Sequence, residues 1–199
     1  MDYDLAIDDG PESIPGGTGL LLLHPSIGAT DRIDTDFLRA DTDHFLVVST
    51  RTTAREVEQK LEHYEIDGSK AVILDTLSVD RGYSRRRSDD VHYVAAPDDL
   101  DGVVARVREF LETHDGKLRV SVDSLTEMAY YADVDAVYDA TGDLLDLLAE
   151  HDAVGIFHLS KEVHDEATLA RFQDLFDGVV NLADDGSVTY EPAERTSEN

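Results

Sequence analysis

The sequence contains no cysteine, so it has neither a disulfide framework nor a thiolate metal site. It also lacks any apolar run approaching the roughly 18 residues that a membrane-spanning helix requires. No N-terminal segment joins basic residues to an apolar stretch as a secretory signal does. We therefore expect a soluble, cytoplasmic protein that contacts no membrane. The length of 199 residues suits one domain with a sizeable core.

Positive charge is also scarce. The chain has 17 lysine and arginine residues against 44 acidic ones, a formal net charge of −27. Such a surface repels nucleic acid, because phosphate binding depends on clustered lysine and arginine. The hydrophobic content of 41% excludes a disordered acidic chain. Acidic residues spread through periodic segments, with lysine rare, resemble the composition of proteins from salt-loving archaea, where concentrated salt screens the self-repulsion.

Strand patterns alternate with helical patterns along the chain. We expect strands at 20–23, 45–49, 71–74, 91–94, 118–123, 154–159, 179–182 and 187–190, the last two forming a hairpin. Helices are expected from about 31, after 53, from 97–99, and over 134–151 and 166–176. This order predicts a single α/β domain, residues 1–199, with a mostly parallel sheet. Turn-forming residues predict a loose lead-in over 1–19, and the chain end predicts a frayed tail over 192–199.

One strand ends in a carboxylate. The segment from Lys117 to Leu125 reads KLRVSVDSL, which predicts a buried strand that closes with Asp123. Open α/β sheets bind their ligands at the carboxyl ends of the strands. In nucleotide-hydrolysing P-loop proteins, a carboxylate at this place helps to hold Mg²⁺. The alternative interpretation is that Asp123 only caps the segment that begins at Ser124.

Two longer stretches carry a resemblance to a known family. They read SLTEMAYYADVDAVYDATGDLLDLL, directly after Asp123, and GIFHLSKEVHDEATLARFQDLFDGVVNL, from Gly155. Together with an apolar strand, a Pro-Ser-Gly turn and a strand ending in Ser-Thr, they resemble the RecA/KaiC-like P-loop ATPases over residues 14–190. The resemblance is greatest to a divergent haloarchaeal branch of KaiC-like proteins. It implies a three-layer α/β P-loop NTPase (RecA/KaiC-like) fold with a mostly parallel central sheet.

The resemblance places the phosphate loop of the family on the turn after His24. Such a loop needs glycines for close backbone approach, a lysine for the β- and γ-phosphates and a Ser or Thr for Mg²⁺. Its Gly-Lys-Thr falls on Ala29, Thr30 and Asp31, or one residue earlier, on Gly28, Ala29 and Thr30. Neither register supplies the lysine, so the resemblance implies a degenerate phosphate loop.

The catalytic glutamate of the family falls on Arg51 or Thr52, and an arginine cannot act as a general base for water. We therefore predict no catalytic residue and no metal site. Backbone N–H groups at the start of the following helix could still bind an anion weakly. We expect either a plain strand-to-helix turn or a vestigial nucleotide site comprising Ser26, Gly28, Thr30 and Asp123. No cofactor is expected, with ATP and Mg²⁺ as the alternative.

Three residues near the last long strand carry metal-ligating atoms, namely His158, His164 and Asp165. Imidazole and carboxylate would suit Zn²⁺ or another first-row metal, but the spacing matches no strong metal motif. We favour the structural interpretation, in which His164 or Asp165 lies at a helix N-terminus and His158 at the sheet edge. The hydroxyls near the strand ends do not predict a nucleophile either, since no histidine-based triad accompanies them.

A basic cluster follows the third predicted strand, at Arg81, Arg85, Arg86 and Arg87. It could bind an acidic partner or nucleic acid. The interpretation that we favour is a solvated loop whose arginines pair with nearby acids at Asp80, Asp89 and Asp90.

Three functions are compatible with these residues. The first is a non-catalytic RecA/KaiC-like domain that regulates by binding another protein. The second is an ATP-binding or weakly active ATPase of the KaiC-like class, and the third is an assembly subunit of a homo-oligomer. We favour the first, because the missing lysine and glutamate remove two independent parts of the chemistry. The sequence names no partner.

Overall fold

The computed structural model describes residues 1–27, 29–86 and 88–193. Its main sheet has the strand order β10-β9-β3-β8-β7-β4-β5-β6, and every neighbouring pair is parallel except β9 and β10. The strands are β3 (Gly19–His24), β4 (His44–Ser49), β5 (Ala71–Asp75), β6 (Val91–Tyr93), β7 (Leu118–Asp123), β8 (Val154–Ser160), β9 (Gly178–Leu182) and β10 (Val188–Pro192). The helices are α1 (Asp31–Arg39), α2 (Ala54–His63), α3 (Leu100–Thr113), α4 (Leu125–Tyr131), α5 (Val134–Glu150) and α6 (Glu166–Gln173). The predicted α/β domain with a mostly parallel sheet is confirmed, as is the β9–β10 hairpin.

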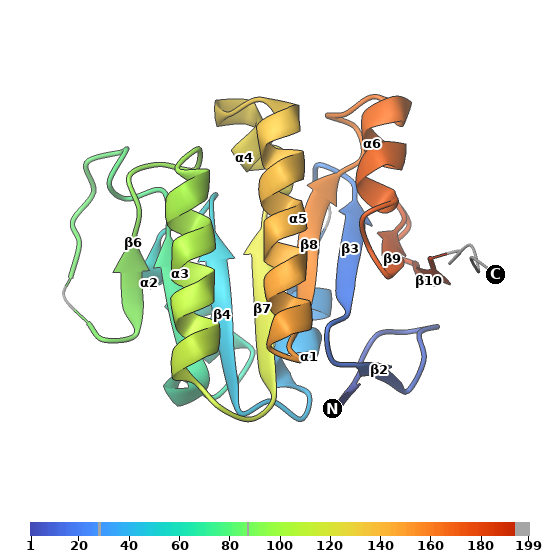
Figure 1. Cartoon of the computed structure of the whole chain (residues 1–199), viewed down its shortest axis with the longest axis horizontal. Coiled ribbons are helices and arrows are strands. Elements are labelled where there is room, and N and C mark those ends of the chain that lie inside the picture. Colours follow the sequence, from blue (N-terminus) through green and yellow to red (C-terminus); the bar gives the residue numbers. More distant parts are fainter. Residues whose placement is uncertain (28, 87, 194–199) are drawn as a thin grey trace.

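Helices cover both faces of this sheet, which makes three layers (Figure 1). The side chains of a strand alternate between faces, so the continuous apolar run of β3 supplies both cores. Leu21 and Leu23 pack with α3, α5 and α6, whereas Leu20 and Leu22 pack with α1 and α2. All four leucines are buried. A strand that is apolar throughout is therefore what a two-sided sheet requires.

Most of the helices begin where the sequence supplies a side-chain cap. Thr53 and Glu56 form a reciprocal capping box at the start of α2. Asp99 and Asp133 accept a backbone N–H at the starts of α3 and α5. Ser124 caps α4. Periodicity did not predict this helix, because it has only 7 residues, of which two, Leu125 and Met128, are buried.

The lead-in expected over residues 1–19 is instead ordered structure. Strands β1 (Asp2–Asp4) and β2 (Ser13–Pro15) pair antiparallel in a small second sheet. Tyr3 is buried, and its hydroxyl donates to the carbonyl of Asp152 at 2.8 Å and accepts from the N–H of Leu118 at 3.1 Å. The guanidinium of Arg119 is buried over the Tyr3 ring at 5.3 Å. Long-range contacts that no local pattern encodes hold this segment, so the prediction of a loose lead-in was wrong.

The other end differs less from expectation. Pro192 ends β10, and Ala193 donates its N–H to the carbonyl of Asp177 at 2.9 Å. The rest of the predicted tail, 194–199, lies outside the described residues. Within the described part of the chain, no helix combines the length and the apolar character needed to cross a membrane.

Candidate functional site

The carboxyl ends of β3, β7 and β8 carry polar side chains. Side chains alternate between the two faces of the sheet along each strand. The residues that lie on the same face as Leu20 and Leu22 point toward α1 and α2. The polar side chains that this rule places on that face include His24, Ser121, Asp123 and His158. The two helices contribute Asp34 and Lys60, and the loop after β4 contributes Arg51. We call these seven residues the buried polar cluster.

Asp34 is the centre of the cluster. Its carboxylate is fully enclosed, with 1% of the side chain exposed. Oδ1 accepts from the Ser121 hydroxyl at 2.5 Å and lies 3.2 Å from Nε2 of His158, while Oδ2 accepts from Nζ of Lys60 at 3.2 Å. Burial alone would raise the pKa of this carboxyl, but Lys60 and His158 outweigh it and lower the pKa far below its usual range. Asp34 therefore stays charged inside the protein.

Lys60 provides the compensating positive charge. Besides Asp34, its ammonium lies 3.4 Å from Oδ1 of Asp31 at the start of α1. Burial would lower the pKa of Lys60, but Asp34, Asp123 and Asp31 together raise it well above the ordinary lysine value. Its charge is thus fully engaged by the protein's own carboxylates.

Asp123 also forms an ion pair, with Arg51. Arg51 directs Nε and Nη2 at the same carboxylate oxygen, Oδ1, at 3.0 and 2.6 Å. Nδ1 of His158 lies 3.8 Å from that oxygen. The cap of α4 is the hydroxyl of Ser124, which accepts from the N–H of Glu127 at 3.2 Å. Asp123 therefore faces the cluster, and the interpretation that it only caps the next helix was wrong.

The pKa values of His24 and His158 are shifted in opposite directions. Burial lowers the pKa of His24, whose Nδ1 lies 2.8 Å from the Pro25 carbonyl oxygen. Burial also opposes a charge on His158, but Asp123 and Asp34 outweigh it and raise its pKa. Nε2 of His24 and Nδ1 of His158 have no hydrogen-bond partner among the described residues. His158 lies in β8, an interior strand, so its predicted place at the sheet edge was wrong.

The structure describes three residues of the predicted vestigial nucleotide site, namely Ser26, Thr30 and Asp123. One parallel strand, β8, lies between β3 and β7, so it separates the turn after β3 from Asp123 at the carboxyl edge of the sheet. Ser26 contacts Ser160 of β8, with 2.8 Å between the two hydroxyl oxygens. Thr30 is buried and precedes α1 without a side-chain capping bond. Gly28 lies outside the described residues.

The turn already holds a carboxylate of the protein. The backbone N–H of Ser26 donates to Oε2 of Glu162, from the loop after β8, at 3.0 Å. Hydrogen bonding by the side chain of Ser26, and then by its backbone N–H, lowers the pKa of Glu162. A phosphate that accepted a hydrogen bond from the same N–H would have to displace Glu162 and would be repelled by its negative charge.

Sequence reasoning missed Asp34 and Lys60, although the helical patterns contained a signal. Asp34 lies three residues before the buried Phe37 and four before Leu38, on the same helical face. Lys60 likewise lies three residues after the buried Val57. The apolar face of α1 thus carries an acidic residue and that of α2 a basic one. Two such residues of opposite sign predict a buried ion pair between the helices.

The three residues considered for a metal site have different partners in the structure. Asp165 caps α6 by accepting the N–H of Thr168 at 2.8 Å, as the structural interpretation predicted. Nε2 of His164 lies 3.0 Å from the hydroxyl oxygen of Thr126. Among the residues that the structure describes, no group of three or more potential metal-ligating side chains is arranged to hold an ion.

The basic cluster pairs differently from the prediction. Arg81 lies 3.7 Å from Asp80, as expected, but donates a shorter bond of 2.8 Å to the hydroxyl of Tyr131. Arg86 pairs with Glu58 on α2, and no ion pair of an arginine with Asp89 or Asp90 occurs in the described part of the loop. Arg87 lies outside it.

Similar architectures occur among solved structures. A KaiC-like protein from the hyperthermophilic archaeon Pyrococcus horikoshii matches with a TM-score of 0.64 at 13% identity, covering 94% of this chain and 84% of that one. An ATPase from the type III secretion system of pathogenic bacteria matches with a TM-score of 0.64 at 14% identity, over 93% of this chain and 57% of that one, so this chain spans little more than half its length. A second Pyrococcus horikoshii protein matches with a TM-score of 0.61 at 9% identity, over 92% of this chain and 90% of that one. The chain therefore has the KaiC/RecA-like P-loop fold.

At the level of sequence, a search of curated proteins finds no match. A family model, described as a family of unknown function (DUF7090), matches residues 1–192. Because this match covers nearly the whole chain, the protein is a member of the DUF7090 family.

Proposed function

We propose that this protein is a non-catalytic KaiC-like domain that acts in regulation by binding another protein in a halophilic archaeon. One observation carries the proposal. Near the turn that corresponds to the phosphate loop, Lys60 and Arg51 are both paired with carboxylates of the protein itself. A site that catalyses phosphoryl transfer needs its cations directed at the nucleotide.

The electrostatics at this place oppose a triphosphate. Its lysine position holds Ala29 or Thr30, and Asp31 adds a carboxylate at the start of α1. Glu162 holds the N–H of Ser26. A nucleotide would have to displace an existing acceptor and approach two negative charges, without the lysine that normally compensates for its own charge.

The hydrolytic step has no base in the expected position. Arg51 or Thr52 lies where the family has a glutamate, and neither side chain supplies a carboxylate base. Arg51 donates to Asp123 rather than accepting a proton from water. Binding of a protein partner requires neither group, and the net charge of −27 supports a salt-rich environment.

The test is phosphate release with ATP and Mg²⁺ in molar KCl, with calorimetry of nucleotide binding in the same buffer. We expect no turnover above the buffer rate in the wild type or in Asp123→Ala. A preparation of a known ATPase, assayed in the same salt, serves as the positive control. Steady turnover that Asp123→Ala abolishes would refute the proposal and establish an ATPase.

A further inference from the structure

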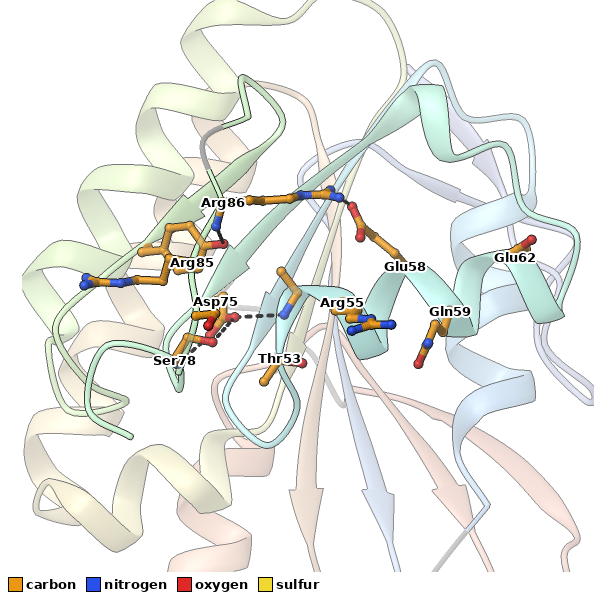
Figure 2. A pocket seen from close by; sticks show the side chains of 12 residues that line it. Thr53, Arg55, Glu58, Gln59, Glu62, Asp75, Ser78, Arg85 and Arg86 are labelled. Carbon is orange, nitrogen blue, oxygen red and sulfur yellow. Dashed lines mark hydrogen bonds and ion pairs between the residues drawn. The ribbon is translucent and has the colours of Figure 1, made fainter. Parts of the chain in front are cut away.

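Two adjoining hollows lie between α2 and the segment that leads into β6. The first has a volume of about 520 Å³ and the second about 470 Å³. They share Glu58, Glu62 and Arg86, so they form one continuous groove along α2. Figure 2 shows the first hollow, with Arg55, Glu58 and Glu62 along the helix and Arg86 reaching across to Glu58. We call this the α2 groove.

One end of the α2 groove is cationic. Arg55 on α2 and Arg85 on the facing segment line it, and neither forms an ion pair or a hydrogen bond with any described residue. Asp75 also lines this end, but its carboxylate accepts from the N–H groups of Ala54, Leu77 and Ser78 and from the Ser78 hydroxyl. The charge of Asp75 is therefore directed into the protein, away from a ligand.

The ion pair between Arg86 and Glu58 crosses the middle of the groove. It neutralises Glu58, and the N–H of Arg86 also donates to the hydroxyl of Tyr93 at 3.3 Å. Once these pairs are counted, Arg55 and Arg85 remain at one end of the groove, with Glu62 beside them and Asp90 at the other end. Two arginines without an acidic partner stand out in a chain with 44 acidic and 17 basic residues.

The other end of the groove is apolar. Its floor is made of aliphatic side chains from α2, β5 and β6 and the turn between the first two: Leu61, Ile66, Ala71, Ile73 and Val91. All of them also belong to the core beneath α1 and α2. These five side chains are only 2–8% exposed, so a large apolar side chain placed there would gain mainly from the removal of its own surface from water.

We propose that the α2 groove binds an extended segment of a partner protein, with an acidic side chain at Arg55 and Arg85 and a large apolar side chain on the floor at the other end. The inference rests on the proposed protein-binding function and names the surface and the chemistry of the partner. Charge complementarity selects the acidic side chain, because Arg55 and Arg85 have no acidic partner among the residues that the structure describes. The ten residues of α2 extend about 15 Å, which is the length of about five residues of extended chain.

The probe is a set of random seven-residue peptides, displayed and selected against the immobilised full chain in molar KCl, then resynthesised with a fluorescein label. We expect enriched peptides to combine Asp or Glu with a large apolar residue about three to five positions away. Fluorescence anisotropy then gives the Kd of each peptide for the wild type and for the variants below.

Two variants test the two ends of the groove. Arg55→Glu combined with Arg85→Glu reverses the cationic end, and Gly68→Leu fills the apolar end, where an added Cβ meets no atom within 4 Å. The matched controls are Arg32→Glu, on the exposed face of α1, and Gly142→Leu on α5, where an added Cβ likewise meets nothing. We expect each groove variant to raise Kd at least about tenfold and each control to change it by less than about twofold. Far-UV circular dichroism checks that all variants are folded.

Several results would overturn the proposal. These are no enrichment over a blank surface, enriched peptides without the acidic and apolar pair, or a Kd that the groove variants leave unchanged. Saturable binding of decanoate, a carboxylate on an alkyl chain, without peptide binding would assign the groove to a small molecule. Self-association in light scattering that the double arginine variant abolishes would assign it to a second copy of this chain.

The outcome is separable from that of the proposed function. A chain that hydrolyses ATP and also binds these peptides refutes the non-catalytic proposal and leaves the groove assigned. A chain without turnover whose selected peptides ignore both groove variants refutes only the groove.

Discussion

Replacing Lys60 by methionine should destabilise the protein through Asp34. The methionine keeps much of the apolar stem of the lysine but removes the ammonium that lies 3.2 Å from the enclosed carboxylate. Asp34 then retains the Ser121 hydroxyl and His158 as partners. A buried carboxylate that loses its cation has no water to replace it, because only 1% of its side chain is exposed.

The magnitude follows from this geometry. Removing one partner of a buried ion pair costs about 3–5 kcal/mol, and the remaining contact with His158 places this case near the lower value, about 3 kcal/mol. For a chain of this length, each 1 kcal/mol shifts Tm by about 2–4 °C, so we expect a fall of about 6–12 °C. Neutralising the carboxylate as well, in Asp34→Asn with Lys60→Met, should recover at least about 1 kcal/mol of the loss, because the two sites are directly coupled.

The assay is urea unfolding followed by circular dichroism at constant pH in molar KCl, since urea leaves the ionic strength unchanged. Lys117→Met is the control, because the Lys117 side chain is 30% exposed and its partner Asp41 keeps Arg119. We expect this control to lose less than about 1 kcal/mol. A cost below about 1 kcal/mol for Lys60→Met, or a double variant no more stable than Lys60→Met alone, would refute the reasoning.

Two further predictions concern salt and pH. Because the Debye length grows from about 3 Å at 1 M to about 30 Å at 0.01 M, Tm should fall as KCl is removed, and a Tm that stays constant over this range would contradict the role given to the net charge of −27. The pKa of His158 is raised above 6.5 in the folded state, so its charged form contributes stability that is complete below pH 6.5 and is lost as the pH rises through the folded pKa. The Tm difference between the wild type and His158→Asn should therefore shrink above pH 6.5, and a difference that grows with pH would be the opposite result.

Much of the fold could be predicted from local pattern. The run Leu20–Leu23 has the apolar content of a strand buried on both faces, and the segment ending in Asp123 has the alternating pattern of a strand; both are interior strands of the sheet. The first 19 residues could not be predicted, because their order depends on contacts such as that of Tyr3 with Asp152, 149 positions away. Turn-forming residues report local backbone preference, and they are equally compatible with a free segment and a docked one.

The sequence by itself determined the main strands and longer helices, the acidic surface and the absence of a lysine from the turn after β3, because each depends only on residue type and spacing along the chain. The tertiary structure alone decided which charges meet. Asp34 lies 26 positions from Lys60, 87 from Ser121 and 124 from His158, and only the packing of α1 and α2 against β7 and β8 brings them together. The α2 groove likewise exists only because the segment before β6 folds back along α2. Hydrophobic periodicity specifies which face of an element is buried, whereas the partner of a buried charge is set by the order of strands in the sheet.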